Sequence, residues 1–334
     1  MIMSSSHRHM LVVGNGFDLA HGLPTRYQDM LNQLFSDDTP WLSDEERQLF
    51  RCNPLVRYFR KHQNVEGWTG FEGELRTIIN YFCQGYSTTH NDADLYQDSI
   101  EQAFDLKFRE CWRKKQYREL WQSLRQHLNE LIEYIDLYLT KYIPSRMPKE
   151  LSTTTQYPHF IYGRQYDYFL SFNYTNTYFN FAQMIHSGSG IAVPTEDHFI
   201  HGRCSIDGDP QNIVLGIEDD NPSNLDTIYF KKYFQRIQKK TGREVFDWFD
   251  QEITPGDPIV TDIFGHSLDT TDKDILMLIF EKSQHTNIYY YDQSDYESKI
   301  INLVKLYGSP DEFTKRYYNH QIRLYNGIIE YFMS

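Results

Sequence analysis

Residues 10–18 read Met10-Leu11-Val12-Val13-Gly14-Asn15-Gly16-Phe17-Asp18, and the predicted fold depends most on this segment. The first four residues are apolar and partly β-branched, which is typical of a buried strand, and a helical pattern begins at Phe17. A strand, a glycine turn and a helix in this order let a backbone approach a diphosphate beside a helix N-terminus. Leu19 stands where the usual fingerprint has a third glycine. A tight turn without a ligand also fits, and Asp18 complements the helix dipole in either case.

A second helix is predicted through Tyr27 and Leu34, with Thr25 as its N-cap. Residues 41–150 then carry helical patterns and no convincing strand. Apolar side chains recur at three- and four-residue steps in Phe71 to Cys83 and in Ser99 to Tyr142. We therefore expect a helical bundle inserted into, or lying beside, an α/β core.

Strand signals return after residue 150 and alternate with helical ones. The predicted strands are Tyr168 to Phe172, His198 to His201, Ile213 to Ile217, Pro258 to Phe264 and Asn287 to Tyr291, and a helix is predicted for Asp272 to Glu281. This alternation indicates an α/β fold with a Rossmann-like, mostly parallel sheet and a large helical insertion. We expect residues 1–40 and 151–334 to form one discontinuous domain and residues 41–150 to form the insertion.

The composition excludes several classes of protein. The 334 residues include 33 basic and 46 acidic side chains, a formal charge of −13 that disfavours nucleic acid and anionic membranes as partners. No apolar stretch approaches the roughly 20 residues of a membrane-spanning helix, and residues 1–10 do not resemble a secretory signal. The four cysteines are spaced neither as a disulfide framework nor as zinc ligands, so we expect reduced, mostly buried thiols and no metal. A cytoplasmic location follows as an expectation.

Three further motifs follow predicted strands. Asn173 ends one strand and could hold a ribose hydroxyl or a water, or could be a turn residue that bonds its own backbone. His201 precedes a glycine and has the ring chemistry for proton transfer near neutral pH, although a lone histidine is more often structural. Gly265 and Ser267 offer an amide and a hydroxyl to a phosphate or ribose, beside a helix cap at Thr271 or Asp272. Because the carboxyl ends of parallel strands meet at one edge, all these motifs would converge on one cleft.

The segment Leu11 to Tyr27, LVVGNGFDLAHGLPTRY, resembles the N-terminal signature of AbiH-type phage abortive-infection proteins, whose core is similar to sirtuin-like NAD-binding domains. Trp68 to Leu75 also resembles the AbiH group. The later FNYT, HG and FGHSL segments resemble the asparagine turn, the catalytic His-Gly and the nucleotide loop of the sirtuin-like family. The chain lacks the four-cysteine zinc module of sirtuin deacylases and the arginine that follows their Gly-Ile-Pro-Asp-Phe run, which argues against deacylation of lysine.

The resemblance implies a role for each matched residue. His201 would accept the proton and Asn173 would orient a ribose hydroxyl or water. Tyr291 and Asp292 would flank the adenosine half. The remaining residues implied to line the dinucleotide are Gly14, Asn15, Gly16, Phe17, Asp18, Leu23, Pro24, Thr25, Gly265 and Ser267.

Two functions are compatible with these residues. The first is NAD glycohydrolysis by an anti-phage effector, with NAD as substrate, nicotinamide and ADP-ribose as products, and no metal. Such an enzyme must be silent until infection, so we expect a gate formed by the helical insertion or a homo-oligomer interface, opened by a phage-derived trigger. The second is a non-catalytic module that senses NAD or ADP-ribose and signals to a partner. A nuclease fits less well, because the sequence shows no cluster of carboxylates for a metal.

Overall fold

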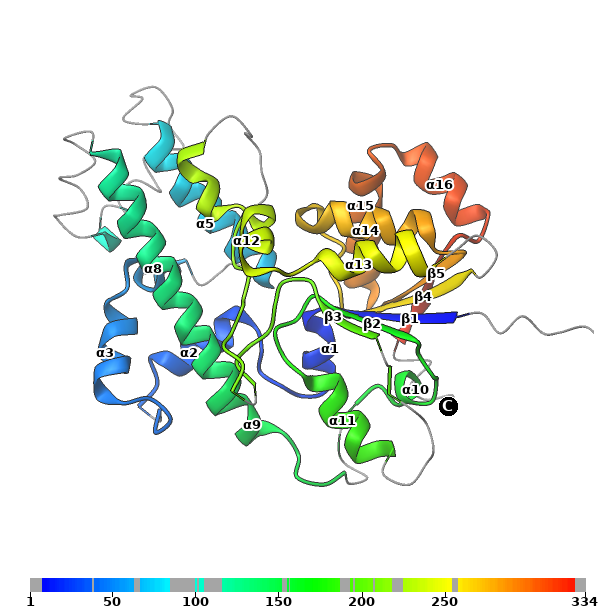
Figure 1. Ribbon diagram of the computed structural model, residues 1–334, viewed down its shortest axis with the longest axis horizontal. Helices are drawn as coiled ribbons and strands as arrows, with labels where there is room; N and C mark the ends of the chain where they lie inside the picture. The colour runs from blue at the N-terminus through cyan, green and yellow to red at the C-terminus, as the bar shows by residue number, and fades with distance from the viewer. Residues whose placement is uncertain are drawn as a thin grey trace, which may run out of the picture. The chain divides into compact units, whose positions relative to one another are not determined.

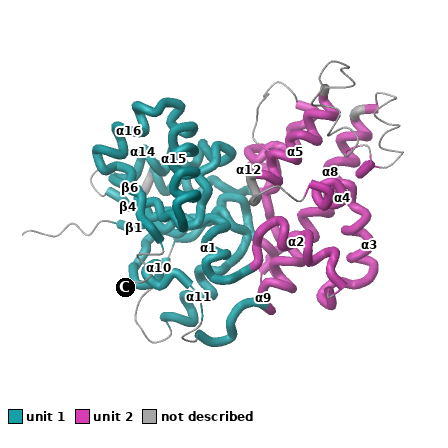
Figure 2. The backbone as a smooth tube through the Cα atoms, turned by 180° about the vertical axis from the view of Figure 1, so that it is seen from behind, with its two compact units in different colours: residues 1–23, 146–203, 240–334 teal, residues 24–145, 204–239 magenta. Residues whose placement is uncertain are grey.

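The computed structural model describes most of the chain. The described residues are 8–37, 39–62, 67–84, 100, 102–104, 116–151, 155, 157–186, 193–194, 196–206, 208–217, 225–253 and 258–327. Two compact units divide them, and each unit is built from segments that are distant in the sequence (Figure 2). The first unit holds residues 1–23, 146–203 and 240–334, and the second holds residues 24–145 and 204–239.

A six-stranded sheet forms the centre of the first unit, and every neighbouring pair of strands is parallel (Figure 1). The strands lie in the order β3-β2-β1-β4-β5-β6, which is the order of a Rossmann fold and confirms the predicted α/β class. The chain begins at β1, adds β2 and β3 on one side, and then returns to add β4, β5 and β6 on the other. The strands are β1 (Arg8–Val13), β2 (Tyr168–Ser171), β3 (Glu196–Phe199), β4 (Ile259–Phe264), β5 (His285–Tyr290) and β6 (Ile322–Asn326).

Alternating apolar side chains give the sheet two buried faces. On β1, Met10 and Val12 belong to one hydrophobic cluster, and Leu11 and Val13 belong to the other. Because both faces are covered, the strands read as continuous apolar runs, which is why β1 and β2 were predictable. The order of strands reverses between β1 and β4, and ligands of such sheets gather beyond the carboxyl ends of the strands at this reversal.

Helices cover both faces of this sheet (Figure 1). One face packs against α13 (Arg243–Asp247), the π-helical turn η3 (Trp248–Glu252), α14 (Lys273–Lys282), α15 (Gln293–Tyr307) and α16 (Pro310–Tyr318). The other face packs against α1 (Asn15–Ala20), α10 (His159–Tyr162) and α11 (Thr177–His186). The 3₁₀ turn η4 (Thr270–Asp272) leads directly into α14.

Helices are the main regular structure among the described residues of the second unit (Figure 2). They are α2 (Tyr27–Leu34), α3 (Asp44–Cys52), α4 (Pro54–Lys61), α5 (Gly67–Gln84), α8 (Tyr117–Leu137), the π-helical turn η1 (Tyr138–Tyr142), the 3₁₀ turn η2 (Leu225–Phe230) and α12 (Lys232–Lys239), and α9 (Ile143–Arg146) runs into the first unit. The unit has other bounds than the predicted insertion, residues 41–150: it begins at residue 24, and it adds the separate stretch 204–239. It includes α2, which contacts α3 and α5, and it includes η2 and α12, since η2 contacts α8.

The predicted strand Ile213 to Ile217 is wrong. This segment lies in the second unit, where it pairs with the side chain of Gln235 on α12 and not with a strand. The side-chain oxygen of Gln235 accepts from the amide of Leu215 at 3.0 Å, and its side-chain nitrogen donates to the carbonyl of Leu215 at 2.8 Å. Lys239 donates to the carbonyl of Ile213, and Ile217 bridges to Lys231. Side chains thus satisfy an extended backbone outside any sheet.

Several smaller expectations also change. The N-cap of α2 is Arg26, not Thr25, and its amide donates to the Asp29 side chain at 3.0 Å. Cys52 and Cys83 are exposed, against the expectation of mostly buried thiols, and Cys111 lies outside the described residues. Much of the helix predicted from Ser99 also lies outside them, and the described part ends in α8 and η1. In the described part of the chain, no helix is both long and apolar enough to span a bilayer.

Candidate active site

The turn after β1 and the loop after β4 pack against each other, backbone against backbone. The amide of Gly14 donates to the carbonyl of Phe264 at 3.1 Å, and the amide of Gly16 donates to the carbonyl of Gly265 at 2.8 Å. A Cβ on Gly16 would lie 2.7 Å from Cα of Gly265, and a Cβ on Gly265 would lie 2.2 Å from the nitrogen of Phe17. Gly265 also has a φ of 71°, in the left-handed region. The glycines are therefore required by this contact between two loops.

This packing changes the expected role of the glycine turn. The sequence predicts that its main-chain amides receive a diphosphate, but those of Gly14 and Gly16 donate to the β4 loop, and that of Phe17 donates to the carbonyl of Gly14 at 2.8 Å. The side chain of Asn15 is half-buried, and Ser267 is exposed. Side chains such as these, rather than the three amides, remain as candidates to contact a phosphate.

Asn173 ties the end of β2 to the same turn. Its Nδ2 donates to the carbonyl of Gly14 at 2.9 Å, and its own amide donates to Oγ of Ser171 at 3.0 Å. Asn173 is buried. Asn173 therefore lies beside the glycine turn and forms a hydrogen bond with it. This differs from the alternative prediction, in which Asn173 bonds only its own backbone.

Asp18 lies in the first turn of α1 and is buried. Oγ1 of Thr175 donates to its Oδ2 at 2.7 Å, and Oγ1 of Thr177 donates to Oγ1 of Thr175 at 3.1 Å. Burial raises the pKa of Asp18 from 3.8 to about 6, although hydrogen bonds from Thr175, Thr177 and Asn173 favour the charged form. Asp18 therefore changes its protonation state near neutral pH, a property often found in functional sites.

His201 follows β3 and contacts a residue that comes after β4. Nε2 of His201 lies 2.9 Å from Oδ1 of Asp272, and Oδ2 of Asp272 lies 3.6 Å from Nε2 of His266. The three side chains are buried. Because β2 and β1 separate β3 from β4 in the sheet, the two segments must extend toward each other beyond the strand ends. These contacts link the loops after β1, β3 and β4 in the first unit, and the predicted cleft stays a prediction.

Local structure fixes the position of His201. The amide of Ile200 donates to the carbonyl of Ser171 at 2.9 Å, which continues the pairing with β2, and Gly202 then turns the chain with a φ of 72°. Phe172 fills the space between the two histidines: its ring centroid lies 5.5 Å from that of His201 and 4.2 Å from that of His266, both edge-on. The buried Phe172 ring thus packs against both imidazoles.

A family model described as bacteriophage abortive infection AbiH matches residues 10–291, which is more than half of the chain. The chain belongs to the AbiH family. A search of curated proteins finds no match. The matched range contains β2 to β5, β1 from Met10 onward and every residue of the His201–Asp272–His266 cluster.

Other residues predicted to line the site have different surroundings. Leu23 is buried, and its amide donates to the carbonyl of Asp18 at 3.1 Å. Pro24 and Thr25 begin the second unit, where the carbonyl of Pro24 accepts from the Tyr138 hydroxyl at 2.6 Å. Asp292 is the N-cap of α15, and its Oδ1 accepts from the amide of Asp295 at 2.8 Å. This capping role accounts for an aspartate at this position without a ligand.

Sequence reasoning missed Asp272 and Phe172, and gave no role to His266. Thr271 or Asp272 was predicted as a helix cap. Asp272 is the N-cap residue of α14, but its side chain makes no capping hydrogen bond, and the preceding turn η4 is capped by Asp269, whose Oδ1 accepts from the amide of Thr271 at 3.0 Å. The sequence feature that could have indicated these residues is the segment Gly265 to Asp272, where a histidine and two aspartates closely follow the end of a predicted strand. In the described part of the chain, no group of three or more His, Cys, Asp or Glu side chains is arranged to hold a metal ion.

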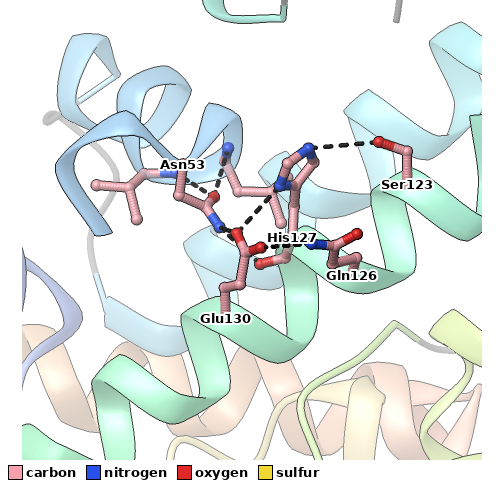
Figure 3. Close-up of polar contacts among 7 residues, drawn as sticks. Asn53, Ser123, Gln126, His127 and Glu130 are labelled. Carbon is pink, nitrogen blue, oxygen red and sulfur yellow. Dashed lines mark hydrogen bonds and ion pairs between the residues drawn. The ribbon is translucent and has the colours of Figure 1, made fainter. Parts of the chain in front are cut away.

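A polar cluster in the second unit has the chemical components of a catalytic relay but serves a structural purpose. Figure 3 shows Ser123, His127 and Glu130 on α8, with Oγ of Ser123 3.4 Å from Nε2 of His127 and Oε2 of Glu130 3.1 Å from Nδ1. Asn53 completes the cluster: it caps α4 through Oδ1 and donates from Nδ2 to the carbonyl of His127 at 2.8 Å. The main-chain amides on either side of Ser123 lie inside α8, so they are not available as oxyanion donors to it. The cluster joins α4 to α8.

Proposed function

We propose that this AbiH protein hydrolyses NAD to nicotinamide and ADP-ribose, and that His201 accepts the proton. One observation carries the proposal: the loops after β1, β3 and β4 come together where the strand order reverses, the place where parallel sheets bind nucleotides. Family membership supports a role in phage abortive infection, and the resemblance of the same segments to sirtuin-like domains supports NAD as the ligand.

The chemistry assigns the proton to His201. Water attacks C1′ of the nicotinamide ribose, the bond from C1′ to the nicotinamide nitrogen breaks, and its electron pair neutralises the pyridinium. A proton from the water passes to the imidazole of His201. A positioned base typically contributes about 10²–10⁴-fold to such a step, and exclusion of other water by Phe172 limits side reactions.

Asp18 contributes a second proton-sensitive group to the proposed site. Its carboxyl is held by Thr175, and Asn173 links the same turn to the end of β2. A hydrogen bond to a sugar hydroxyl beside the scissile bond strengthens as positive charge develops on the ribose. Asp18 and Asn173 therefore remain proposed ribose contacts, whereas the diphosphate is assigned to the side chains of Asn15 and Ser267.

The test is nicotinamide release from NAD by the purified protein, and loss of cellular NAD on expression with and without phage infection. His201→Asn should abolish both signals, because Asn cannot accept the proton. His186→Asn, at the end of α11 in the same unit, is the control and should retain them. Retention of activity in His201→Asn, with an unchanged melting temperature, would exclude His201 as the base.

A second function, sensing of NAD or ADP-ribose without turnover, is favoured by the burial of His201 and Asp272. Its signature is tight binding by calorimetry with no nicotinamide formed, both in the purified protein and in infected cells. Nicotinamide formed only in infected cells would instead support an enzyme that phage infection activates.

A further inference from the structure

Asp272 is shared between two histidines that lie in the loops after different strands, β3 and β4. Oδ1 faces Nε2 of His201 at 2.9 Å, and Oδ2 faces Nε2 of His266 at 3.6 Å. The side chain of Asp272 is 10% exposed, and those of His201 and His266 are 7% and 4% exposed. A buried carboxylate is costly unless it is paired, so this position requires at least one histidine as its partner.

Three hydrogen bonds hold His266 and the residue after it. Its Nδ1 accepts from the amide of Leu268 at 2.9 Å, so the neutral ring carries its proton on Nε2, toward Asp272. Its carbonyl accepts from Nζ of the buried Lys299 at 2.9 Å. The adjacent carbonyl of Ser267 accepts from Asn302 at 2.9 Å. Two residues of α15 therefore clamp this loop.

The loop also contains backbone strain at a defined place. Leu268 has a φ of 60°, in the left-handed region that a leucine rarely adopts. Its side chain is fully buried in the hydrophobic cluster that also contains Met10 and Val12, and this burial offsets the strain. Its amide is the donor to Nδ1 of His266. Strained positions of this kind persist where the surrounding structure over-determines them, and they cluster at functional sites.

We propose that Asp272 is the positioning residue of His201 and that His266 holds Asp272 in place. A carboxylate at Nε2 makes this nitrogen the proton-bearing one in neutral His201, so Nδ1 is the nitrogen that accepts the substrate proton. The same negative charge stabilises the imidazolium that forms. The proposal rests on the proposed function, because it names the parts that orient the base of that site.

The contact between His201 and Asp272 is short, at 2.9 Å between Nε2 and Oδ1, but it does not have the geometry of an aligned hydrogen bond. Catalytic hydrogen bonds are often poorly aligned without substrate and straighten when it binds. The clamp on His266 leaves Asp272 a fixed partner on one side, so movement of His201 alone is enough to align the pair.

Three variants separate the roles. Asp272→Asn removes the charge with little change in shape. His266→Asn keeps an acceptor for the amide of Leu268 but removes Nε2. Asp269→Asn is the matched control, because it removes the same charge three residues away and retains an N-cap side chain.

Imidazole nitrogen NMR of the full-length, ligand-free protein tests the positioning without any need for activity. Signals of His201 are assigned by their absence in His201→Asn. We expect one neutral tautomer of His201 in the wild type and in Asp269→Asn, with the proton on Nε2. Asp272→Asn should give a mixture or the opposite tautomer, and His266→Asn a partial shift toward it. A His201 tautomer unchanged in Asp272→Asn would overturn the proposal, and if that variant fails to fold, an unchanged tautomer in folded His266→Asn would overturn it.

Kinetics with NAD then distinguish this proposal from the proposed function. Where the wild type releases nicotinamide, Asp272→Asn should lower kcat by about 10²–10⁴-fold, the contribution of a general base, and leave KM within about threefold. The kcat of His266→Asn should lie between those of Asp272→Asn and the control Asp269→Asn. A normal kcat in Asp272→Asn would overturn the positioning role while NAD hydrolysis stands. The expected tautomers in a protein that never cleaves NAD would support the positioning and exclude the enzyme.

Discussion

The hydroxyl of Thr175, just past β2, donates a 2.7 Å hydrogen bond to the buried carboxyl of Asp18 on α1, joining two segments that are 157 residues apart. Burial outweighs this bond and raises the pKa of Asp18 to about 6. The carboxyl sits beside the glycine turn that the β4 loop packs against, so its charge state affects the centre of the first unit.

Asp18→Asn should change how stability depends on pH. The pKa of Asp18 is higher in the folded than in the unfolded protein, so its contribution is complete below about pH 4 and is lost as pH rises through 6. The loss amounts to about 3 kcal/mol. The free energy of unfolding, measured in urea, should therefore rise in Asp18→Asn relative to the wild type by about this amount as the pH is raised from 4 to 7. Parallel curves for the two proteins would exclude the raised pKa.

His21→Asn should show the opposite slope. His21 donates from Nδ1 to the carbonyl of Phe17 at 2.7 Å and accepts from the Tyr162 hydroxyl at 2.9 Å, and burial lowers its pKa from 6.5 to about 4. A lowered folded pKa gives stability that is present above pH 6.5 and lost as pH falls through 4. His21→Asn, which keeps a donor for Phe17, should lose less stability than the wild type between pH 7 and pH 4. An equal loss in urea titrations would contradict this assignment.

Gly265→Ala should separate the two loops. The added Cβ meets the backbone of Gly16 and Phe17, which cannot move aside as a flexible side chain can. Gly308→Ala is the control, since Gly308 has a similar φ of 69° but open space around it. We expect about 1 kcal/mol of destabilisation for Gly308→Ala from the left-handed backbone alone. Gly265→Ala should cost clearly more by chemical denaturation. Equal costs would show that the close approach of the loops is absent.

Lys232→Met should strongly destabilise the second unit. Nζ of Lys232 lies 2.8 Å from Oε1 of Glu72, and both side chains are at most one-tenth exposed. Removal of one partner leaves a buried charge, which typically costs about 3–5 kcal/mol, whereas Lys232→Met combined with Glu72→Gln should recover much of the loss. Arg243→Met, which breaks an exposed pair with Asp247, should cost less than about 1 kcal/mol. Lack of recovery in the double variant would contradict the pairing.

Local patterns predicted the part of the fold that is governed by short-range rules. The apolar run of β1 and the glycine turn after it were predictable because burial on both faces requires such a run. The same rule wrongly predicted a strand at Ile213 to Ile217. There the side chains of Gln235 and Lys239 form the hydrogen bonds that a neighbouring strand would form with this backbone. The sequence reading also passed over β6, although Ile322 to Asn326 completes the sheet.

The site was only partly predictable for a related reason. Placement at a strand end pointed to His201, because topology alone brings strand ends to one edge. Its partner Asp272 lies beyond a loop whose path depends on Gly265, on the left-handed Leu268 and on the clamp from Lys299. No spacing in the sequence encodes such a path, and the glycines pointed to a ligand although they serve a contact between loops.

The most direct test of the central claim is a structure of the protein saturated with ADP-ribose, which carries the ribose and diphosphate of the proposed substrate. We expect the free ribose within hydrogen-bonding distance of His201 or Asp18, with the diphosphate near Asn15 and Ser267. Density for the ligand away from the ends of β1, β3 and β4, or no bound ligand at millimolar concentration, would contradict a nucleotide site at this edge of the sheet.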